Sequence, residues 1–208
     1  NFCPDHIQYT SNEDSSLLTI PAGDCTGTGY NTSNSGGNIP TTPSVYTIAF
    51  EDLGSIGDYD FNDIVLYVYP DKSASTLKVN LVAAGGILPV DVYYNDTKMF
   101  SHNNGSMENT ASDNNDKTKV ISTYTTALPS DFTLSDNNFI SKFKIIVQNS
   151  NGTETSVAAS TEKGEAPQAL LIPTNWTWPK ETVNIGTRYP KFKNWISDKT
   201  KDTNWYEE

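Results

Sequence analysis

The sequence predicts an all-β protein, an antiparallel β-sandwich of jelly-roll-like type with one short C-terminal helix. Short runs rich in β-branched and aromatic residues recur along the chain. Asn, Gly, Asp and Pro separate these runs, as turns do between antiparallel strands. Eleven Tyr and eight Phe among 208 residues provide the material for a packed core and argue against a disordered chain.

The N-terminal part of the chain differs in composition from the rest. One apolar run, residues 17–20, is typical of a strand. Residues 24–43 are almost entirely Gly, Asn, Ser, Thr and Pro, which indicates a linker or a long loop. We therefore expect an N-terminal segment and linker at residues 1–41, followed by the β-sandwich domain at residues 42–208.

Eight further runs are typical of strands because each is apolar or alternating and ends at turn residues. They are residues 45–50, 64–69, 77–83, 88–94, 120–126, 139–148, 155–159 and 168–172. The run at 139–148 is the longest apolar run and predicts a central strand. Residues 101–117 are polar and predict a long exposed loop.

The C-terminal tail carries the pattern of a helix. Phe192, Trp195 and Ile196 are spaced so that they share one helical face, which predicts a helix within residues 190–197. We expect the acidic loop described next to lie at one end of the sandwich and the aromatic tail to close over it.

The stretch at residues 51–63 carries the strongest functional signal. The first basic residue of the chain is Lys72, so no preceding Lys or Arg offsets the mutual repulsion of its carboxylates. Oxygen ligands on a loop that contains glycine are what a hard cation requires. We therefore predict a calcium site in this loop. Its predicted ligands are Glu51, Asp52, Asp58, Asp60, Asn62 and Asp63.

The spacing of Asp58, Asp60 and Asn62 permits two local structures. An extended segment would put all three side chains on one side, whereas a tight loop would wrap them around an ion, as the start of an EF-hand loop does. A full EF-hand is excluded, because Asp63 stands where glycine is needed and Tyr69 where a bidentate Glu is needed. The alternative to a metal site is an acidic turn held by its own Asx hydrogen bonds.

Several motifs resemble the LruC-type domain, a family of secreted and surface lipoproteins of bacteria with no known function. They are FEDL at 50–53, GDYDFNDIV at 57–65, QALLIP at 168–173, WPKE at 178–181, YPKFKNW at 189–195 and NWY at 204–206. The resemblance runs from about residue 45 to the end. It is interrupted at 149–165, where the family's segment rich in Pro, Gly and His is not recognisable. The resemblance implies an extracytoplasmic protein.

The negative charge is concentrated at the N-terminal end. Residues 1–71 contain ten Asp or Glu and no Lys or Arg, whereas the whole chain has a net charge of −11. Because no basic patch is present to neutralise phosphates, we expect no nucleic-acid partner. No apolar run is long enough to span a membrane. We expect that a leader was removed, and a lipid anchor at that removed N-terminus is one possibility.

Cys3 and Cys25 are the two cysteines of the chain. A pair close in sequence predicts one disulfide, worth about 3 kcal/mol in the chain-entropy model. Two buried free thiols, or a metal site that also uses His6, are the alternatives. A disulfide would fit an extracytoplasmic compartment.

Catalytic patterns are poor in this sequence. Its two histidines, His6 and His102, lie in polar segments, and no nucleophile elbow or phosphate-binding loop is recognisable. The acidic cluster could supply the paired carboxylates of a glycoside hydrolase, but a dense cluster without a base suits a cation better than a pair with two separated pKa values. We predict no catalytic residues and no enzyme.

Four tryptophans lie in the last part of the chain, at Trp176, Trp178, Trp195 and Trp205. Exposed rings could stack on sugars, but we expect them to close the open end of the sandwich as part of its core.

These observations predict a non-enzymatic, extracytoplasmic binding or cell-adhesion module with a structural calcium site at residues 51–63. We expect it at the cell surface, associated with the outer membrane, or in the periplasm. Its partner would be an unidentified protein or glycan on a surface. The alternative is a carbohydrate-active protein, either a sugar-binding module or a metal-dependent glycoside hydrolase.

Overall fold

The computed structural model describes residues 45–52, 58–103, 105–112, 115–130, 132, 137–158 and 167–207, all within the compact unit Pro43–Glu208. The predicted strand at 17–20, the predicted disulfide between Cys3 and Cys25, and the predicted segment 1–41 lie outside these residues.

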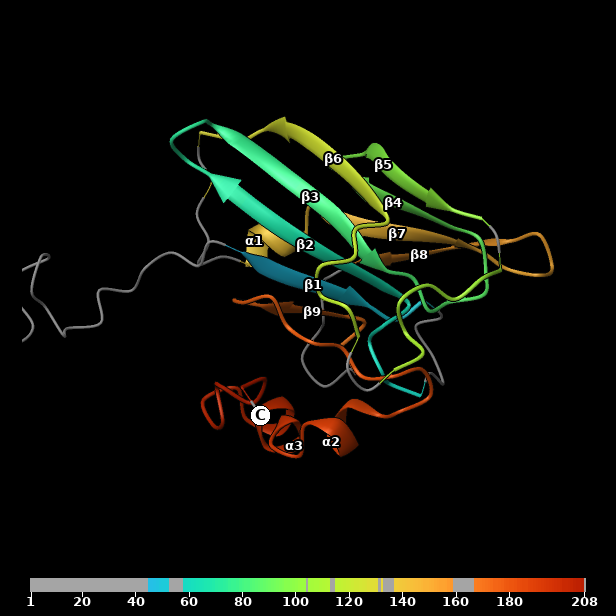
Figure 1. The fold of residues 1–208 in the computed structure, drawn as a ribbon, viewed down its shortest axis with the longest axis vertical. Coiled ribbons are helices and arrows are strands. Elements are labelled where there is room, and N and C mark those ends of the chain that lie inside the picture. The colour runs from blue at the N-terminus through green and yellow to red at the C-terminus, as the bar shows by residue number, and fades with distance from the viewer. Residues whose placement is uncertain are drawn as a thin grey trace, which may run out of the picture. The chain divides into compact units, whose positions relative to one another are not determined.

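Two antiparallel sheets form the fold (Figure 1). One sheet contains β1 (Tyr46–Phe50), β2 (Ile64–Asp71), β3 (Thr76–Ala83), β6 (Ser122–Ala127) and β9 (Ala169–Ile172), in the order β6-β3-β2-β1-β9. The other contains β4 (Val90–Tyr94), β5 (Thr97–His102), β7 (Phe143–Gln148) and β8 (Glu154–Ala158), in the order β5-β4-β7-β8. The predicted all-β antiparallel sandwich is therefore confirmed.

The main core lies between the two sheets. Ile48, Leu66 and Val79 alternate along β1, β2 and β3 with side chains on the other face, and all three are fully buried. Val92 of β4 and Ile145 of β7 belong to the same buried cluster. β7 lies between β4 and β8, so the strand within the apolar run 139–148 is a central one, as expected.

A second core covers the outer face of the five-stranded sheet. Val65 and Tyr67 of β2 are outward-facing yet buried, because Trp176, Trp178 and Trp205 of the C-terminal segment pack against this face. The expected burial of the tryptophans is thus correct for these three, but the expected place was wrong, because they cover the outer face of this sheet and not the open end of the sandwich. Trp195, by contrast, is only half-buried at the edge of the cluster.

Helices are short in the described residues: α1 (Asn137–Ile140), α2 (Ile185–Arg188) and α3 (Phe192–Ser197). The predicted C-terminal helix corresponds to α3, but the expectation of a single helix was wrong. The run predicted as a strand over 139–148 begins in α1, where the ring of Phe139 packs edge-on against Phe132 and Phe143. Only its second half forms β7.

The expected exposed loop at 101–117 is also wrong in part. Asn95 and Asp96 both have positive φ angles, 46° and 63°, and make the two-residue turn that pairs β4 with β5. Ser101 and His102, the first residues of the predicted loop, are the last two residues of the edge strand β5. Further along, Thr110 and Asn115 are buried.

Candidate functional site

The acidic loop joins two neighbouring strands at one end of the five-stranded sheet. Phe50, the last residue of β1, pairs directly with Ile64, the first residue of β2. Antiparallel pairing therefore brings Glu51 and Asp63 out of the sheet side by side, although many residues separate them in sequence. Among the residues between them, 51–52 and 58–63 are described.

The backbone from Asp58 to Asn62 forms a tight loop and not an extended segment. Tyr59 and Phe61 both have φ angles of 55°, in the left-handed region that residues other than glycine rarely adopt. Such a conformation costs of order 1–3 kcal/mol per residue and persists only where its surroundings hold it. Here the Phe61 N–H donates to Glu51 Oε1 at 2.6 Å, and the Phe61 ring is fully buried in the second core.

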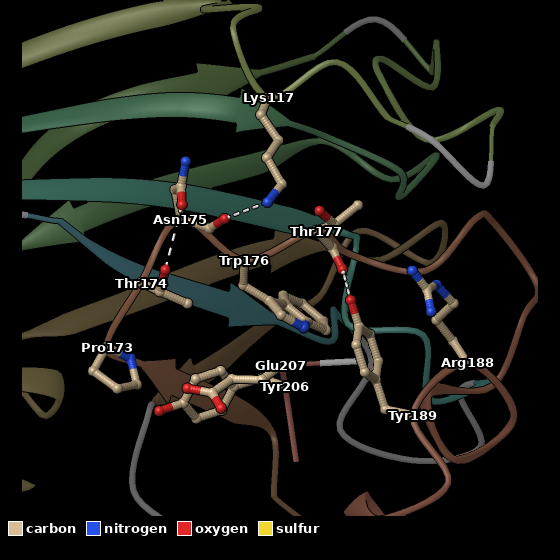
Figure 2. Close-up of a pocket in the computed structure, with 10 residues that line it drawn as sticks. All are labelled: Lys117, Pro173, Thr174, Asn175, Trp176, Thr177, Arg188, Tyr189, Tyr206 and Glu207. Carbon is tan, nitrogen blue, oxygen red and sulfur yellow. Dashed lines mark hydrogen bonds between the residues drawn. The ribbon is translucent and has the colours of Figure 1, made fainter. Parts of the chain in front are cut away.

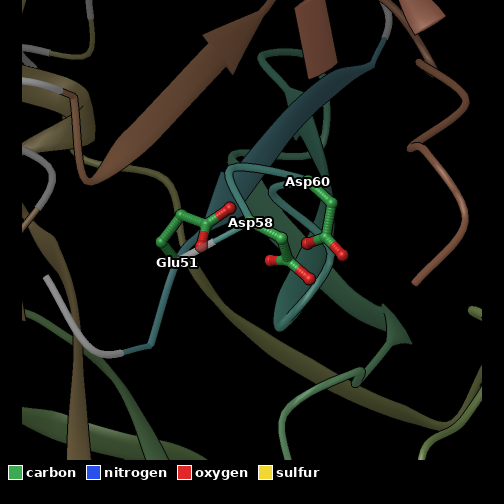
Figure 3. A group of neighbouring side chains, drawn as sticks. All are labelled: Glu51, Asp58 and Asp60. Atoms are coloured by element: carbon green, nitrogen blue, oxygen red, sulfur yellow. The ribbon is translucent and has the colours of Figure 1, made fainter. Parts of the chain in front are cut away.

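Three carboxylates converge in this loop. One oxygen from each of Glu51, Asp58 and Asp60 lies within 4.8 Å of the others, and Figure 3 shows the three side chains together. Glu51 and Asp60 are buried, whereas Asp58 is exposed. A cation held between them would therefore be reachable from solvent on the side of Asp58.

Asp52 and Asp63 form a second acidic pair beside the first group. The backbone N–H of Asp52 donates to Asp63 Oδ2 at 2.8 Å, which holds the Asp63 side chain against the backbone of Asp52. A Cβ on Gly86 would stand 2.7 Å from Asp52 Oδ2 and 3.3 Å from Asp63 Oδ1. Only glycine lets the backbone come this close to both carboxylates.

The side chain of Asn62 carries an unsatisfied acceptor. Its Oδ1 is buried without a hydrogen-bond partner, in a residue that is 0% exposed. Its Nδ2 donates to Pro179 O at 3.3 Å, and because that carbonyl can only accept, the amide orientation is fixed with Oδ1 on the opposite side. A buried acceptor without a donor costs about 1–3 kcal/mol, so this oxygen favours a cation or a donor from outside the described chain.

Glu181 brings a further carboxylate to the same place. Its Oε2 is also buried and has no hydrogen-bond partner. A Cβ on Gly85 would stand within 2.6 Å of both Glu181 Oε2 and Asn62 Oδ1. Both oxygens thus lie close to one point beside a glycine, and a side-chain hydrogen bond with Asn62 partly offsets the effect of burial on the pKa of Glu181. A bound cation would stabilise two acceptor oxygens placed in this way.

The electrostatics of the loop agree with this geometry. Burial, with added repulsion from neighbouring carboxylates, raises the pKa of Asp63 to about 9, that of Glu51 to about 8 and that of Asp60 to about 7. The pKa of Asp52 rises to about 6 for the same reasons, and burial also raises the pKa of Glu181. None of these carboxylates forms an ion pair with Lys or Arg in the described ranges. Each negative charge is therefore costly until a cation or a proton compensates it.

The segment at 179–185 closes over the loop from the other side. The Thr182 N–H donates to Asp60 Oδ2 at 2.9 Å, and the Ile185 N–H donates to Tyr59 O at 2.8 Å. Asn184, which caps the N-terminus of α2, donates from Nδ2 to Asp58 O at 2.9 Å. The loop is thus held between the sheet and the C-terminal segment.

Sequence reasoning named six residues of this cluster but missed Glu181. Of the six, Glu51, Asp58 and Asp60 converge most closely. Asp52 and Asp63 lie together against Gly86, and Asn62 lies against Gly85. Glu181 belongs to the WPKE motif at 178–181, but nothing in its local spacing connects it with the acidic loop. Gly85 and Gly86 indicated only the end of a strand.

Comparisons with known proteins find a family over the C-terminal part of the chain. The profile of a domain of unknown function, DUF4842, matches residues 146–206. A solved structure of a candidate lipoprotein from Bacteroides ovatus aligns with a TM-score of 0.47 and 13% identity, over 79% of this chain and 73% of that one. No curated protein matches the chain.

Within the described residues, no helix is both long and apolar enough to cross a membrane. The LruC-type resemblance stays a prediction, since the matched profile carries a different description. Over residues 146–206, which include Glu181 and the second-core tryptophans, the chain is similar to a domain family of unknown function.

Proposed function

We propose that this protein is a non-enzymatic binding or cell-adhesion module whose β-sandwich is stabilised by a calcium ion in the acidic loop. The observation that carries the proposal is the convergence of Glu51, Asp58 and Asp60 within 4.8 Å, beside the buried and unpartnered Oδ1 of Asn62. Asp52, Asp63 and Glu181 are the further ligands within this cluster.

Calcium fits this donor set better than other common metals do. All candidate ligands offer oxygen, and Cys and His are absent from the cluster. Zinc prefers nitrogen and sulfur in tetrahedral sites, and magnesium keeps much of its water in a small octahedral shell. Calcium takes 6–8 oxygens, which side chains, backbone carbonyls and water can supply together.

The burial of the carboxylates favours a structural role over catalysis. Glu51 is 6% exposed and Asp60 is 1% exposed, so a sugar ring could not reach both of them as it must in a glycoside hydrolase. Asp60 also accepts hydrogen bonds from the backbone N–H groups of Asn62 and Thr182. These hydrogen bonds fix the position of the Asp60 carboxylate. A fixed carboxylate is suited to binding a metal ion, but it is poorly suited to exchanging protons with a substrate.

In this proposal the protein acts outside the cytoplasm, at the cell surface or in the periplasm. The acidic N-terminal composition and the lack of a basic patch support a module that meets cations and surface ligands and does not meet nucleic acid. Millimolar calcium outside cells would fill even a weak site of this kind.

Thermal unfolding tests the metal directly. The full chain is melted in chelator, in calcium, in magnesium and in zinc, together with an Asp60→Asn variant that keeps the side-chain shape. A ligand that binds only the folded state stabilises it by about 2.7 kcal/mol at a hundredfold excess over its Kd. We expect calcium to raise the melting temperature of the wild type and to have little effect on Asp60→Asn.

The matched control is Asp96→Asn, which removes a carboxylate from the β4–β5 turn, where a positive φ favours Asn as well as Asp. This variant should keep the full calcium response. Superimposable melting curves of the wild type in calcium and in chelator would refute the metal site. Turnover of chromogenic glycosides by the wild type, lost in Asp60→Asn, would replace the proposal with the hydrolase alternative.

A further inference from the structure

A pocket of about 410 Å³ lies beside the second core and shares no lining residue with the acidic cluster (Figure 2). Its volume is within the range of small-molecule sites. Three parts of the chain line it: the loop before β6, the residues directly after β9, and the C-terminal segment. The lining residues are Lys117, Pro173, Thr174, Asn175, Trp176, Thr177, Arg188, Tyr189, Tyr206 and Glu207.

The backbone along one side of the pocket is fixed by buried side chains of the sheet. Thr47 Oγ1 of β1 donates to Thr174 O at 2.6 Å and accepts from the Trp176 N–H at 2.9 Å. Tyr67 OH of β2 donates to Trp176 O at 2.8 Å. Tyr189 OH donates to Thr177 O at 2.6 Å. A wall held in this way is formed before a ligand arrives, which lowers the entropy cost of binding.

Two cations face this pocket in a chain of net charge −11. Lys117 Nζ donates to Asn175 O at 2.7 Å, and the Arg188 guanidinium lies 4.8 Å from the centre of the Tyr189 ring. Figure 2 shows Lys117 beside Asn175, and Arg188 next to Tyr189 on another side of the pocket. In the described part of the chain neither forms an ion pair with a carboxylate, whereas Lys98, Lys119, Lys144 and Lys201 do.

The indole of Trp176 adds a donor with no acceptor. Trp176 is 1% exposed, and its Nε1 is buried without a hydrogen-bond partner. The indole of Trp178, in contrast, donates to Asn109 O at 2.7 Å. A buried donor without a partner is costly, so an acceptor brought by a ligand would relieve that cost.

Cations outnumber carboxylates in the described lining of this pocket. Against Lys117 and Arg188 it has one carboxylate, that of Glu207, whose Oε2 accepts from Asn204 Nδ2 at 3.0 Å. Arg presents paired N–H groups that match a carboxylate. Thr174, Asn175 and Thr177 add hydroxyl and amide groups to the lining, and its aromatic rings give flat faces against which the C–H groups of a sugar ring can pack.

We propose that this pocket binds the carboxylate-bearing ring of an acidic saccharide, with Arg188 and Lys117 as the anion-binding residues. This inference rests on the proposed function, because it names the ligand class of the binding module. A neutral sugar would leave both cations unpaired, and an apolar ligand would cover mostly polar side chains.

Helix α2 connects this pocket with the acidic loop. Asn184, its N-terminal cap, donates to Asp58 O, and Arg188, its last residue, lines the pocket. A dication in the loop would also lower the net negative charge that repels an anionic ligand. Calcium is therefore expected to strengthen saccharide binding without touching the saccharide.

The test is calorimetric titration of the full chain in calcium with an oligogalacturonate, its neutral methyl ester, a sulfated oligosaccharide of equal length and an acidic peptide. We expect the oligogalacturonate to bind, and its ester to bind at least tenfold more weakly. Arg188→Gln and Lys117→Gln should each weaken binding at least tenfold. Lys72→Gln removes the same charge from the turn between β2 and β3, outside the pocket lining, and should have no effect.

A second readout follows the indole N–H resonances by NMR, assigned with tryptophan-to-phenylalanine variants. The Trp176 resonance should shift on addition of the oligogalacturonate and the Trp178 resonance should stay. Equal losses in Lys72→Gln and Arg188→Gln would refute the pocket in favour of diffuse attraction. Binding of only the sulfated saccharide or the peptide, or of no ligand, would refute the ligand class. These results do not bear on the proposed calcium site, because the calcium dependence of thermal unfolding, measured on the same samples, tests that site separately.

Discussion

Asn62 Oδ1 and Glu181 Oε2 approach the same point over Gly85, and both are buried acceptors without a donor. Asn62 comes from the acidic loop and Glu181 from the C-terminal segment, so the two oxygens connect distant parts of the chain. If a cation lies between them, it stabilises the contact between these parts as well as the loop itself.

The first prediction concerns Glu181. Glu181→Gln keeps the shape of the side chain but removes one negative charge from the proposed ligand set. Calcium affinity should fall at least tenfold, which corresponds to about 1.4 kcal/mol of binding free energy. Titration calorimetry measures it, with Glu154→Gln on the exposed part of β8 as a control of equal charge change. Equal affinities for both variants would remove Glu181 from the site.

The second prediction concerns Gly85. A Cβ at this position overlaps Asn62 Oδ1, and moving the buried Asn62 side chain would disturb its hydrogen bond to Pro179 O. Gly85→Ala should therefore lower the free energy of unfolding by about 1–3 kcal/mol and abolish the calcium response. Gly186→Ala is the matched control, since its Cβ meets chiefly the flexible Lys193 side chain. A calcium response retained by Gly85→Ala would show that Asn62 is not a ligand.

The third prediction concerns pH. Asp52, Asp60, Glu51 and Asp63 have folded-state pKa values of about 6, 7, 8 and 9, all above the ordinary values near 4. The metal-free folded state therefore holds protons that the unfolded chain releases, and its stability should fall as pH rises from about 4 to 9. Calcium competes with those protons, so its stabilising effect should grow over the same range.

Denaturant melts at a series of pH values, in chelator and in calcium, measure this prediction. The two curves should nearly coincide at acidic pH and diverge as pH rises. Asp63→Asn should make the metal-free curve flatter between pH 7 and 9, because Asp63 has the highest of the four pKa values, about 9. Parallel curves over the whole range would show that calcium does not bind at these carboxylates.

The fourth prediction concerns exchange of amide hydrogens. Thr182 and Ile185 donate their N–H groups to Asp60 Oδ2 and Tyr59 O. Chelation should speed the exchange of both amides. Repulsion among the carboxylates of the metal-free loop should displace the two acceptor oxygens and weaken these hydrogen bonds. The Trp205 N–H, which donates to Asp202 O in the same C-terminal segment, is the internal reference. Unchanged exchange at Thr182 and Ile185 would show that the metal does not stabilise the contact between this segment and the acidic loop.

The fifth prediction concerns the second core. Trp205 is 2% exposed and contacts the rings of Tyr189, Phe192 and Trp195. Trp205→Ala should cost about 3–5 kcal/mol of stability through loss of buried area and a cavity. Trp195→Ala should cost clearly less because Trp195 is half-buried. Equal melting temperatures for the two variants would contradict the packing described.

The strands could be predicted largely from local sequence. Apolar runs bounded by Gly, Pro or Asn gave β1, β2 and β3 to within two residues at each end. β5 was missed because only Met99 and Phe100 of its six residues are apolar, so it lacks the apolar run that marks the other strands. The continuous burial of β1 could not be foreseen either, because it depends on tryptophans that follow more than a hundred residues later.

Only the part of the candidate site that is continuous in sequence could be predicted. Carboxylates that are close in sequence repel one another whatever the tertiary structure, so their clustering alone indicated a cation. The six loop residues could therefore be predicted from the local sequence. Glu181 and the two glycines depend on tertiary packing, and no local pattern marks them. The alternation of Asp58, Asp60 and Asn62 with aromatic residues fitted a strand as well as a loop. The left-handed φ angles at Tyr59 and Phe61 decide for the loop.

The pairing of β9 with β1 has a consequence for how the polypeptide can be divided. β9 lies within the stretch matched by the family profile, but its hydrogen-bonding partner lies more than a hundred residues earlier, and Trp176 and Trp178 pack on side chains of β1 and β2. A fragment cut at 146–206 would carry an unpaired strand and an uncovered aromatic surface, and should aggregate. The smallest piece that folds on its own must therefore begin before β1, so the boundaries of the profile do not mark an independent folding unit.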